Sequence, residues 1–162
     1  MRSGSPHFAF RGVFRTLACG VACAFALVLA QPASAALGGG SASIAKDQAA
    51  MRGILSVTPM QSFAVHRLVD PAGQTVREYA DRTGRIFAVT WSGSHSPDLQ
   101  ELLGAYYGRY LSAAALHRTG HHIVAIRTPG LVLSVVDFQR SVYGRAYLPS
   151  RLPSGFTPAD LR

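Results

Sequence analysis

Three histidines late in the chain have the spacing closest to a metal-binding pattern. They are His117, His121 and His122, and imidazole is a common ligand of zinc and copper ions. No carboxylate lies within several residues of them, so further ligands would have to come from elsewhere in the chain. Polar residues at a helix end explain the same cluster. We therefore predict no metal site and no cofactor, and keep metal binding by these histidines as an alternative hypothesis.

His95 is the residue best placed for acid–base chemistry. A catalytic histidine needs a nucleophile and an orienting acid within reach. Ser92, Ser94 and Ser96 are close in sequence, but no Gly-x-Ser-x-Gly string surrounds any of them. The sequence therefore predicts no catalytic residue, and a small periplasmic hydrolase that uses His95 is the alternative hypothesis.

A third group combines arginine with aromatic residues, and we expect it to bind a ligand. A guanidinium group can hold a carboxylate or a phosphate through two parallel hydrogen bonds. Aromatic residues at strand or helix spacing are also typical of a hydrophobic core, and that alternative stays open. The candidate ligand-binding residues are Arg77, Tyr79, Trp91, His95, Arg140 and Arg145.

Three β-rich runs joined by two similar turns form the clearest pattern in the chain. The runs are Phe63 to Val69, Thr75 to Ala80 and Ile86 to Trp91. The joints Asp70-Pro71-Ala72-Gly73 and Asp81-Arg82-Thr83-Gly84 both place Asp first and Gly fourth, which is typical of tight turns between antiparallel strands. The pattern predicts a three-stranded antiparallel meander.

Alternation along these runs predicts which side chains share a face of the sheet. Phe87, Val89 and Trp91 are expected on one face of the third run. In the second run Glu78 is expected to point away from Arg77 and Tyr79. Cross-strand pairing with an arginine such as Arg67 or Arg85 would suit Glu78.

An amphipathic helix is expected after the meander. Ser96 is the expected N-cap, Pro97 the first helical residue, and Thr119-Gly120 the end. One stripe at spacings of three and four holds the apolar residues Leu99, Leu102, Leu103, Tyr106, Tyr110, Ala113 and Ala114.

The rest of the chain completes an α+β fold. The meander and one covering helix are followed by two or three further antiparallel strands. The expected elements are a short helix over 43–53, a connector over 54–62, and strands over 122–127, 131–138 and 141–148. We divide the chain into an N-terminal segment 36–62, a core domain 63–149 and an irregular tail 150–162, which we expect to lie over the sheet through Leu152 and Phe156.

The first 35 residues have the three parts of a secretory signal peptide. Arg2, Arg11 and Arg15 form a basic start, an apolar stretch follows over 16–30, and Ala33-Ser34-Ala35 fits a cleavage site. The apolar stretch is shorter than the roughly 20 residues that span a bilayer, although an uncleaved anchor is the alternative. We expect cleavage near Ala35, export to the periplasm or beyond, and no stable transmembrane segment afterwards.

Beyond the leader the chain is basic and lacks cysteine. Of the 16 Lys and Arg residues three lie in the leader, which holds both cysteines and none of the eight Asp and Glu residues. The mature chain therefore has no disulfide, and its excess of arginine would attract an anionic partner. Ordinary solubilising charge explains the same excess. The cations form no run, so no nucleic-acid surface is predicted.

Short strings along the mature chain are similar to those of one protein family. They are Ala36-Leu37-Gly38-Gly39, Val76-Arg77-Glu78-Tyr79, Ile86 to Trp91, Pro97-Asp98-Leu99, Leu102-Leu103-Gly104 and Gly144 to Pro149. Together they resemble the DUF2844 family of exported proteobacterial proteins of unknown function. Where that family often has Gly-His-Met-Arg before the last string, this chain has Asp137-Phe138-Gln139-Arg140, so only the arginine matches. The resemblance implies no activity.

The sequence favours an exported, non-enzymatic binding or assembly module of the bacterial envelope. This interpretation depends on the signal peptide, the compact cysteine-free domain and the lack of a catalytic constellation. The expected partner is an anionic envelope component or an envelope protein. The ligand and the oligomeric state stay open.

Overall fold

Two turns that both begin with Asp and end with Gly fold the first half of the domain into an antiparallel meander. The Asp70 carboxylate accepts hydrogen bonds from the N–H groups of Ala72 and Gln74, both at 2.8 Å. The Asp81 carboxylate does the same in the next turn, and it accepts from the N–H of Arg85. The glycine that closes each turn has a positive φ, 84° and 77°. Both predicted tight turns, with Asp at the first position and Gly at the fourth, are therefore confirmed.

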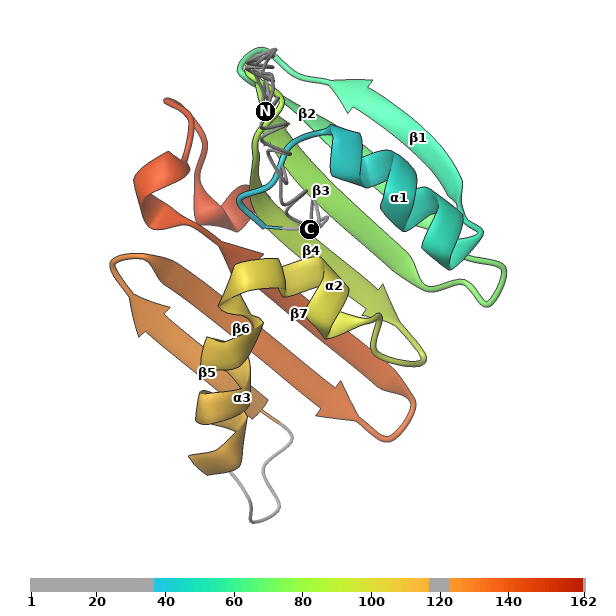
Figure 1. Cartoon of the computed structure of the whole chain (residues 1–162), viewed down its shortest axis with the longest axis vertical. Helices are drawn as coiled ribbons and strands as arrows, with labels where there is room; N and C mark the ends of the chain where they lie inside the picture. The colour runs from blue at the N-terminus through green and yellow to red at the C-terminus, as the bar shows by residue number, and fades with distance from the viewer. Residues whose placement is uncertain (1–36, 117–122, 162) are drawn as a thin grey trace, which may run out of the picture. The chain divides into compact units, whose positions relative to one another are not determined.

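The computed structural model describes residues 37–116 and 123–161, and these contain a seven-stranded antiparallel sheet (Figure 1). The strand order is β1-β2-β3-β4-β7-β6-β5. The strands are β1 (Ile54–Pro59), β2 (Phe63–Val69), β3 (Thr75–Asp81), β4 (Ile86–Gly93), β5 (Ile123–Thr128), β6 (Leu131–Phe138) and β7 (Ser141–Tyr147). The α+β class is thus confirmed. No helix within the described residues is both long and apolar enough to cross a membrane.

The meander has a fourth strand, so the predicted connector over 54–62 is wrong for its first part. Ile54–Pro59 forms β1 and pairs with β2 along its whole length. Only Leu55 of this strand is half-buried, because β1 lies at the edge of the sheet and little covers it. An edge strand needs no buried face, so the alternation that reveals a strand is missing. Pro59 is tolerated at such an edge.

The single covering helix of the prediction is two helices. They are α2 (Leu99–Leu103) and α3 (Tyr107–Leu116), joined by one 3-10 turn, η1 (Gly104–Tyr106). Gly104 has a φ of 50°, a conformation that ends a helix. The N-cap is Asp98, whose carboxylate accepts from the N–H of Glu101 at 3.0 Å, and not Ser96. The predicted end at Thr119-Gly120 lies outside the described residues.

All three helices lie on the same face of the sheet (Figure 1). Helix α1 (Ala42–Met51) contacts β2, and α3 contacts β5. The core on this helix side includes Leu68, Val76 and Leu133 from the sheet and Ile44 and Leu103 from the helices. The helices therefore leave the opposite face of the sheet, which we call the helix-free face, to be covered by other parts of the chain.

The C-terminal segment covers one end of the helix-free face. Residues 149–161 contain two 3-10 turns, η2 (Pro149–Arg151) and η3 (Pro158–Asp160), and Phe156 is buried there against Phe63, Tyr79 and Phe87. Leu152 packs against the same cluster. The tail therefore lies over the sheet through Leu152 and Phe156, as predicted.

Phe87 lies on the helix-free face, so its predicted place beside Val89 and Trp91 is wrong. The pairing of β3 with β4 shifts by one residue, because Tyr79 is opposite Ala88 whereas Ala80 is opposite Ile86. This bulge leaves Phe87 without a direct partner and reverses the alternation there. Val89 and Trp91 belong to the helix-side core, and Phe87 belongs to the aromatic cluster under the C-terminal segment.

Trp91 fits in the core because its neighbour across the β4–β7 pair is Gly144. The indole is 2% exposed and lies where the side chain of a larger residue at 144 would stand. A Cβ built on Gly144 would overlap the Trp91 ring. The β4–β7 contact in the middle of the sheet therefore requires glycine at this position.

Gly144→Ala should destabilise the fold, because either Trp91 or strand β7 must move to make room. We expect a loss of about 1–3 kcal/mol in the free energy of unfolding, as is usual for overpacked cores. Urea denaturation measures it. The control is Gly108→Ala in α3, where an added Cβ meets nothing within 4 Å and alanine should stabilise by up to about 1 kcal/mol. Equal stability of Gly144→Ala and the wild type would contradict this packing.

Glu78 does not pair with an arginine, as the sequence led us to expect. It points to the helix side, is 0% exposed and lies opposite His66 of β2. Its neighbour from α1 is Asp47, also buried. Apart from the hydrogen bond that the two carboxyl groups can share through one proton, none of their four oxygens has a partner within the described residues. Burial, together with Asp47, raises the pKa of Glu78 to about 9, and burial raises the pKa of Asp47 to about 6.

This carboxyl pair makes the stability of the fold depend on pH. The folded protein holds a proton on Glu78 up to a pKa of about 9, whereas the ordinary value is 4.5. The pair's contribution to stability is therefore complete below pH 4.5 and is lost as the pH rises towards 9. Glu78→Gln should remove most of this loss and stabilise the protein at pH 8 by about 1–3 kcal/mol.

Urea unfolding at pH 5, 7 and 9 checks this expectation. The matched control is Asp137→Asn, since Asp137 is exposed on β6 and does not contribute to the pKa shift of either buried carboxyl. That variant should keep the slope of the wild type. A Glu78→Gln variant with an unchanged pH slope would show that the pair does not carry the effect.

Candidate functional site

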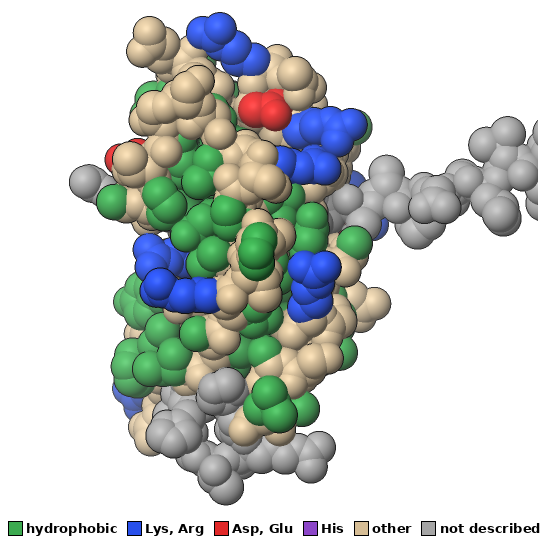
Figure 2. Space-filling view, turned by 90° about the vertical axis from the view of Figure 1, so that its left-hand side faces the viewer, with side chains coloured by type: hydrophobic (Ala, Val, Ile, Leu, Met, Phe, Trp, Pro, Cys, Tyr) green, Lys and Arg blue, Asp and Glu red, His purple; other side chains and the backbone are tan. Residues whose placement is uncertain are grey.

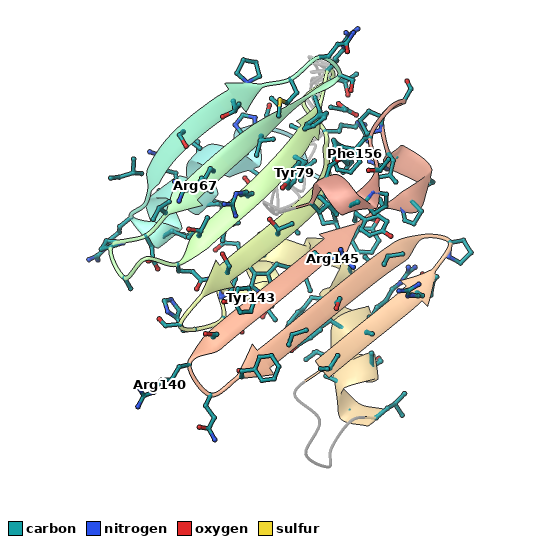
Figure 3. All side chains as sticks on the ribbon, turned by 180° about the vertical axis from the view of Figure 1, so that it is seen from behind. Arg67, Tyr79, Arg140, Tyr143, Arg145 and Phe156 are labelled. Atoms are coloured by element: carbon teal, nitrogen blue, oxygen red, sulfur yellow. The ribbon has the colours of Figure 1, made fainter. Side chains whose placement is uncertain are left out.

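Three arginines lie in one row across the helix-free face, and we call them the arginine row. Arg67 of β2 is directly opposite Arg77 of β3, and Arg77 is opposite Thr90 of β4. Thr90 is in turn opposite Arg145 of β7. Because neighbouring strands are about 4.8 Å apart, the row spans roughly 14 Å from Arg67 to Arg145. Figure 3 shows Arg67 and Arg145 on this face.

The arginine row carries positive charge that no carboxylate among residues 37–116 and 123–161 balances. In the described part of the chain none of its three guanidinium groups has a carboxylate within 4.0 Å. Asp160 is nearby, but its carboxylate accepts from the N–H and hydroxyl of Thr157. Like charges directly opposite each other destabilise a sheet. Arg67 and Arg77 are such a pair, so the row costs stability unless an anion binds to it.

Two cavities on the helix-free face meet at Arg77. One, of about 390 Å³, is lined by Arg77, Thr90, Ser134, Tyr143, Arg145 and Leu161 among others. The second, of about 540 Å³, is lined by Arg67, Arg77 and Asp160 together with Thr58, Met60 and Val65 among others. Ligand sites in proteins commonly have such volumes and combine a few polar groups with apolar walls. The row therefore lies in hollowed surface that a ligand could enter.

Comparison with known proteins places the chain in a family. The model of the family described as "Protein of unknown function (DUF2844)" matches residues 33–161. The chain belongs to the DUF2844 family. No curated protein and no solved structure matches it. Two of the strings that suggested this family, Val76 to Tyr79 and Gly144 to Pro149, are those that carry Arg77 and Arg145.

The structure of this DUF2844 chain unites two of the six predicted ligand-binding residues, Arg77 and Arg145, in the arginine row. Tyr79 lines the second cavity beside Arg77, but it is only 3% exposed and packs in the aromatic cluster with Phe63 and Phe87. Arg140 is in the turn between β6 and β7 and points away from the row (Figure 3).

Trp91 borders the first cavity, but its side chain is buried on the helix side. Its role is therefore structural. For Tyr79 and Trp91 the alternative of a packed aromatic core describes the fold better than ligand binding does.

His95 of the DUF2844 chain stands apart from the row, in the loop after β4. Its Nε2 lies 3.5 Å from the Asp70 carboxylate, and its Nδ1 lies 3.4 Å from the Ser94 hydroxyl. The order Ser–His–Asp is that of a hydrolase triad. Both separations exceed the 2.6–3.2 Å or so of a working nucleophile–base contact. Asp70 moreover accepts two hydrogen bonds within its own turn, which gives it a structural role.

The late histidines His117, His121 and His122 lie outside the described residues. Within 37–116 and 123–161 no group of three His, Cys, Asp or Glu side chains could hold a metal ion.

Three residues of the site were not among the six predicted ligand-binding residues: Arg67, Thr90 and Tyr143. Arg67 and Thr90 lie on the same face as Arg77 because both are directly opposite it. Alternation along β2 and β4 predicts this only when the register of the strands is known. Tyr143 required the pairing of β7 with β4, where it is opposite Ser92. The only signal available was that Tyr143 and Arg145 share a face of one strand.

Arg67→Thr should stabilise the protein by about 0.2–1 kcal/mol, because it removes the repulsion from Arg77 and places a good strand former in β2. The gain should shrink as salt screens the charges. Arg127→Thr is the control, since Arg127 is exposed on the same face but is opposite Val132. Thermal or urea unfolding at low and high salt measures both. A loss of stability in Arg67→Thr, larger than in Arg127→Thr, would argue against strain in the row.

Proposed function

We propose that this DUF2844 protein is an exported, non-enzymatic binding module of the bacterial envelope, and that its helix-free face binds an anionic partner. The observation that carries the proposal is the arginine row, in which Arg67, Arg77 and Arg145 lie across the sheet with no carboxylate within 4.0 Å in the described chain. The partner would supply the negative charge that the row lacks.

The chemistry of the row suits phosphate or carboxylate groups. Guanidinium is planar and always charged, and it offers paired N–H donors that match both groups. Hydroxyl groups at Thr90 and Ser134 extend the row on either side of Arg145. A small anion would contact Arg77 and Arg145 in the first cavity, and an extended polyanion would reach Arg67 as well.

The side of the molecule in Figure 2 agrees with an anion-binding role. It shows lysine and arginine side chains beside exposed hydrophobic ones, with few acidic side chains. A surface of this kind attracts anions over a distance and speeds their association.

The alternatives, a hydrolase with His95 and a metal protein with the late histidines, have less support. Exposed His95 has long contacts to Ser94 and Asp70, and a triad needs closer ones. The helix-free face, in contrast, joins two cavities and three arginines that have no carboxylate within 4.0 Å in the described chain.

The double variant Arg77→Gln/Arg145→Gln should bind a soluble polyanion about tenfold more weakly, or worse, because two charge-assisted hydrogen bonds are lost. The probe is heparin, and the salt concentration that elutes the purified protein from a heparin column is the measurement. The control, Arg85→Gln/Arg109→Gln, removes the same net charge from the β3–β4 turn and from α3. If both double variants shift the elution equally, binding depends only on net charge and the proposal is wrong.

Export predicts a mature chain that begins at Ala36. Mass spectrometry of protein from the periplasmic fraction should find this end, without Cys19 or Cys23, because cleavage follows the Ala33-Ser34-Ala35 string. Replacing Ala33 and Ala35 by Leu should leave the leader attached. Recovery of the intact chain from Met1 in the cytosol would overturn the envelope role.

A further inference from the structure

Three hydrophobic side chains are exposed around a half-buried valine at one corner of the helix-free face, and we call this group the apolar corner. The exposed residues are Ile123 of β5, Phe138 of β6 and Tyr143 of β7, and the valine is Val136 of β6. Ile123 is opposite Val136, and Val136 is opposite Tyr143, so these three form a row across the sheet. Phe138 follows two residues after Val136 and faces the same way. Phe138 is 57% exposed and Tyr143 is 54% exposed.

Cations border the apolar corner. Arg145 follows Tyr143 by two residues on the same face and is exposed, and Arg140 lies in the turn after Phe138. The carboxylate closest in sequence, Asp137, is on the helix side, because it is opposite the buried Val142. Burial raises the pKa of Tyr110 in α3, and Tyr107 and the negative charge of Asp137 add to this shift.

We propose that the apolar corner docks this protein onto an anionic membrane surface. Phe138, Tyr143 and Ile123 would enter the interface between headgroups and acyl chains, where aromatic side chains are favoured. Arg140 and Arg145 would contact lipid phosphates. The inference rests on the proposed function and names its partner, since Arg145 belongs to both the corner and the arginine row.

The combination of side chains favours a membrane over a soluble polyanion or a second copy of the chain. A soluble polyanion would use the cations but would leave Phe138 and Ile123 in water. A second copy of the chain, related by a two-fold axis, would bring the same patch of both copies together. Arg140 and Arg145 of each would then face their equivalents, with no carboxylate from the described part of the corner to offset them. An anionic membrane offers an apolar region to the hydrophobic side chains and phosphate groups to the two arginines.

Co-sedimentation of the purified protein with lipid vesicles tests the proposal. One vesicle is phosphatidylcholine alone, and the other contains about one third phosphatidylglycerol. We expect binding to the anionic vesicle that is at least severalfold tighter, since each arginine near such a surface contributes roughly fivefold in affinity. The variant Phe138→Ser/Tyr143→Ser should bind the anionic vesicle about tenfold more weakly or worse.

Two controls separate the apolar corner from other effects. Leu111→Ser replaces a residue of similar exposure, 49%, on α3, and should bind as the wild type does. Circular dichroism should show that all variants fold, as replacing exposed side chains predicts. A second variant, Ile123→Ser/Phe138→Ser, changes no residue that lines the first cavity. It should lose vesicle binding in the same way and keep its elution from heparin.

The outcomes distinguish this proposal from the proposed function. Heparin binding without vesicle binding would overturn the membrane partner and leave the anion-binding face standing, whereas the loss of both would overturn both. Equal vesicle binding by the wild type and Phe138→Ser/Tyr143→Ser would show that the corner does not insert. A dimer in sedimentation velocity that disappears in this variant would identify a second copy as the occupant instead, and would likewise overturn the membrane partner.

Discussion

The register between β3 and β4 is the constraint on which the rest of the structure depends. Val76 is opposite Trp91 and Arg77 is opposite Thr90, so burial of the first pair under the helices fixes the second pair on the other face. A slip of one residue would turn every side chain of the strand over. Trp91 resists that slip, because its indole fits only above Gly144 of β7. The apolar core thus positions the arginine row without touching it.

Local patterns in the sequence predicted those parts of the fold that a strand and its own turn determine. Strands β2 and β6 have the predicted bounds, since apolar alternation and flanking turn residues mark both. Two features were not predicted, because each depends on a neighbouring strand. Strand β1 is a strand only because β2 offers an edge. Phe87 changes face because the β3–β4 pair contains a bulge, which no apolar period in β4 reveals.

The candidate site was predictable in its residue types but not in its assembly. Arg77 and Arg145 were expected to bind a ligand, yet β3 and β7 are far apart in sequence, and only the insertion of β4 between them brings the two residues into one row. An arginine such as Arg67 or Arg85 was expected to pair with Glu78. The pleat puts Arg67 and Glu78 on opposite faces of the sheet, so the carboxylate is buried with Asp47 and Arg67 has no carboxylate within 4.0 Å among the described residues. The separation of the two charges therefore follows from register.

The sheet consequently divides charge between its two sides. Asp47, Glu78 and Glu101 lie on the helix side, and the first two share a buried environment that favours a bound proton. The arginine row lies on the other side, where a carboxylate partner would have relieved the repulsion between Arg67 and Arg77. Such an arrangement lowers stability on both faces, which natural proteins usually tolerate only where function requires it. It also gives the protein a direction: a field that is positive on one face turns that face towards an anionic surface before contact is made. The proposed recognition of an anion by the helix-free face would account for the three arginines gathered there, where the nearby Asp160 carboxylate accepts hydrogen bonds from Thr157.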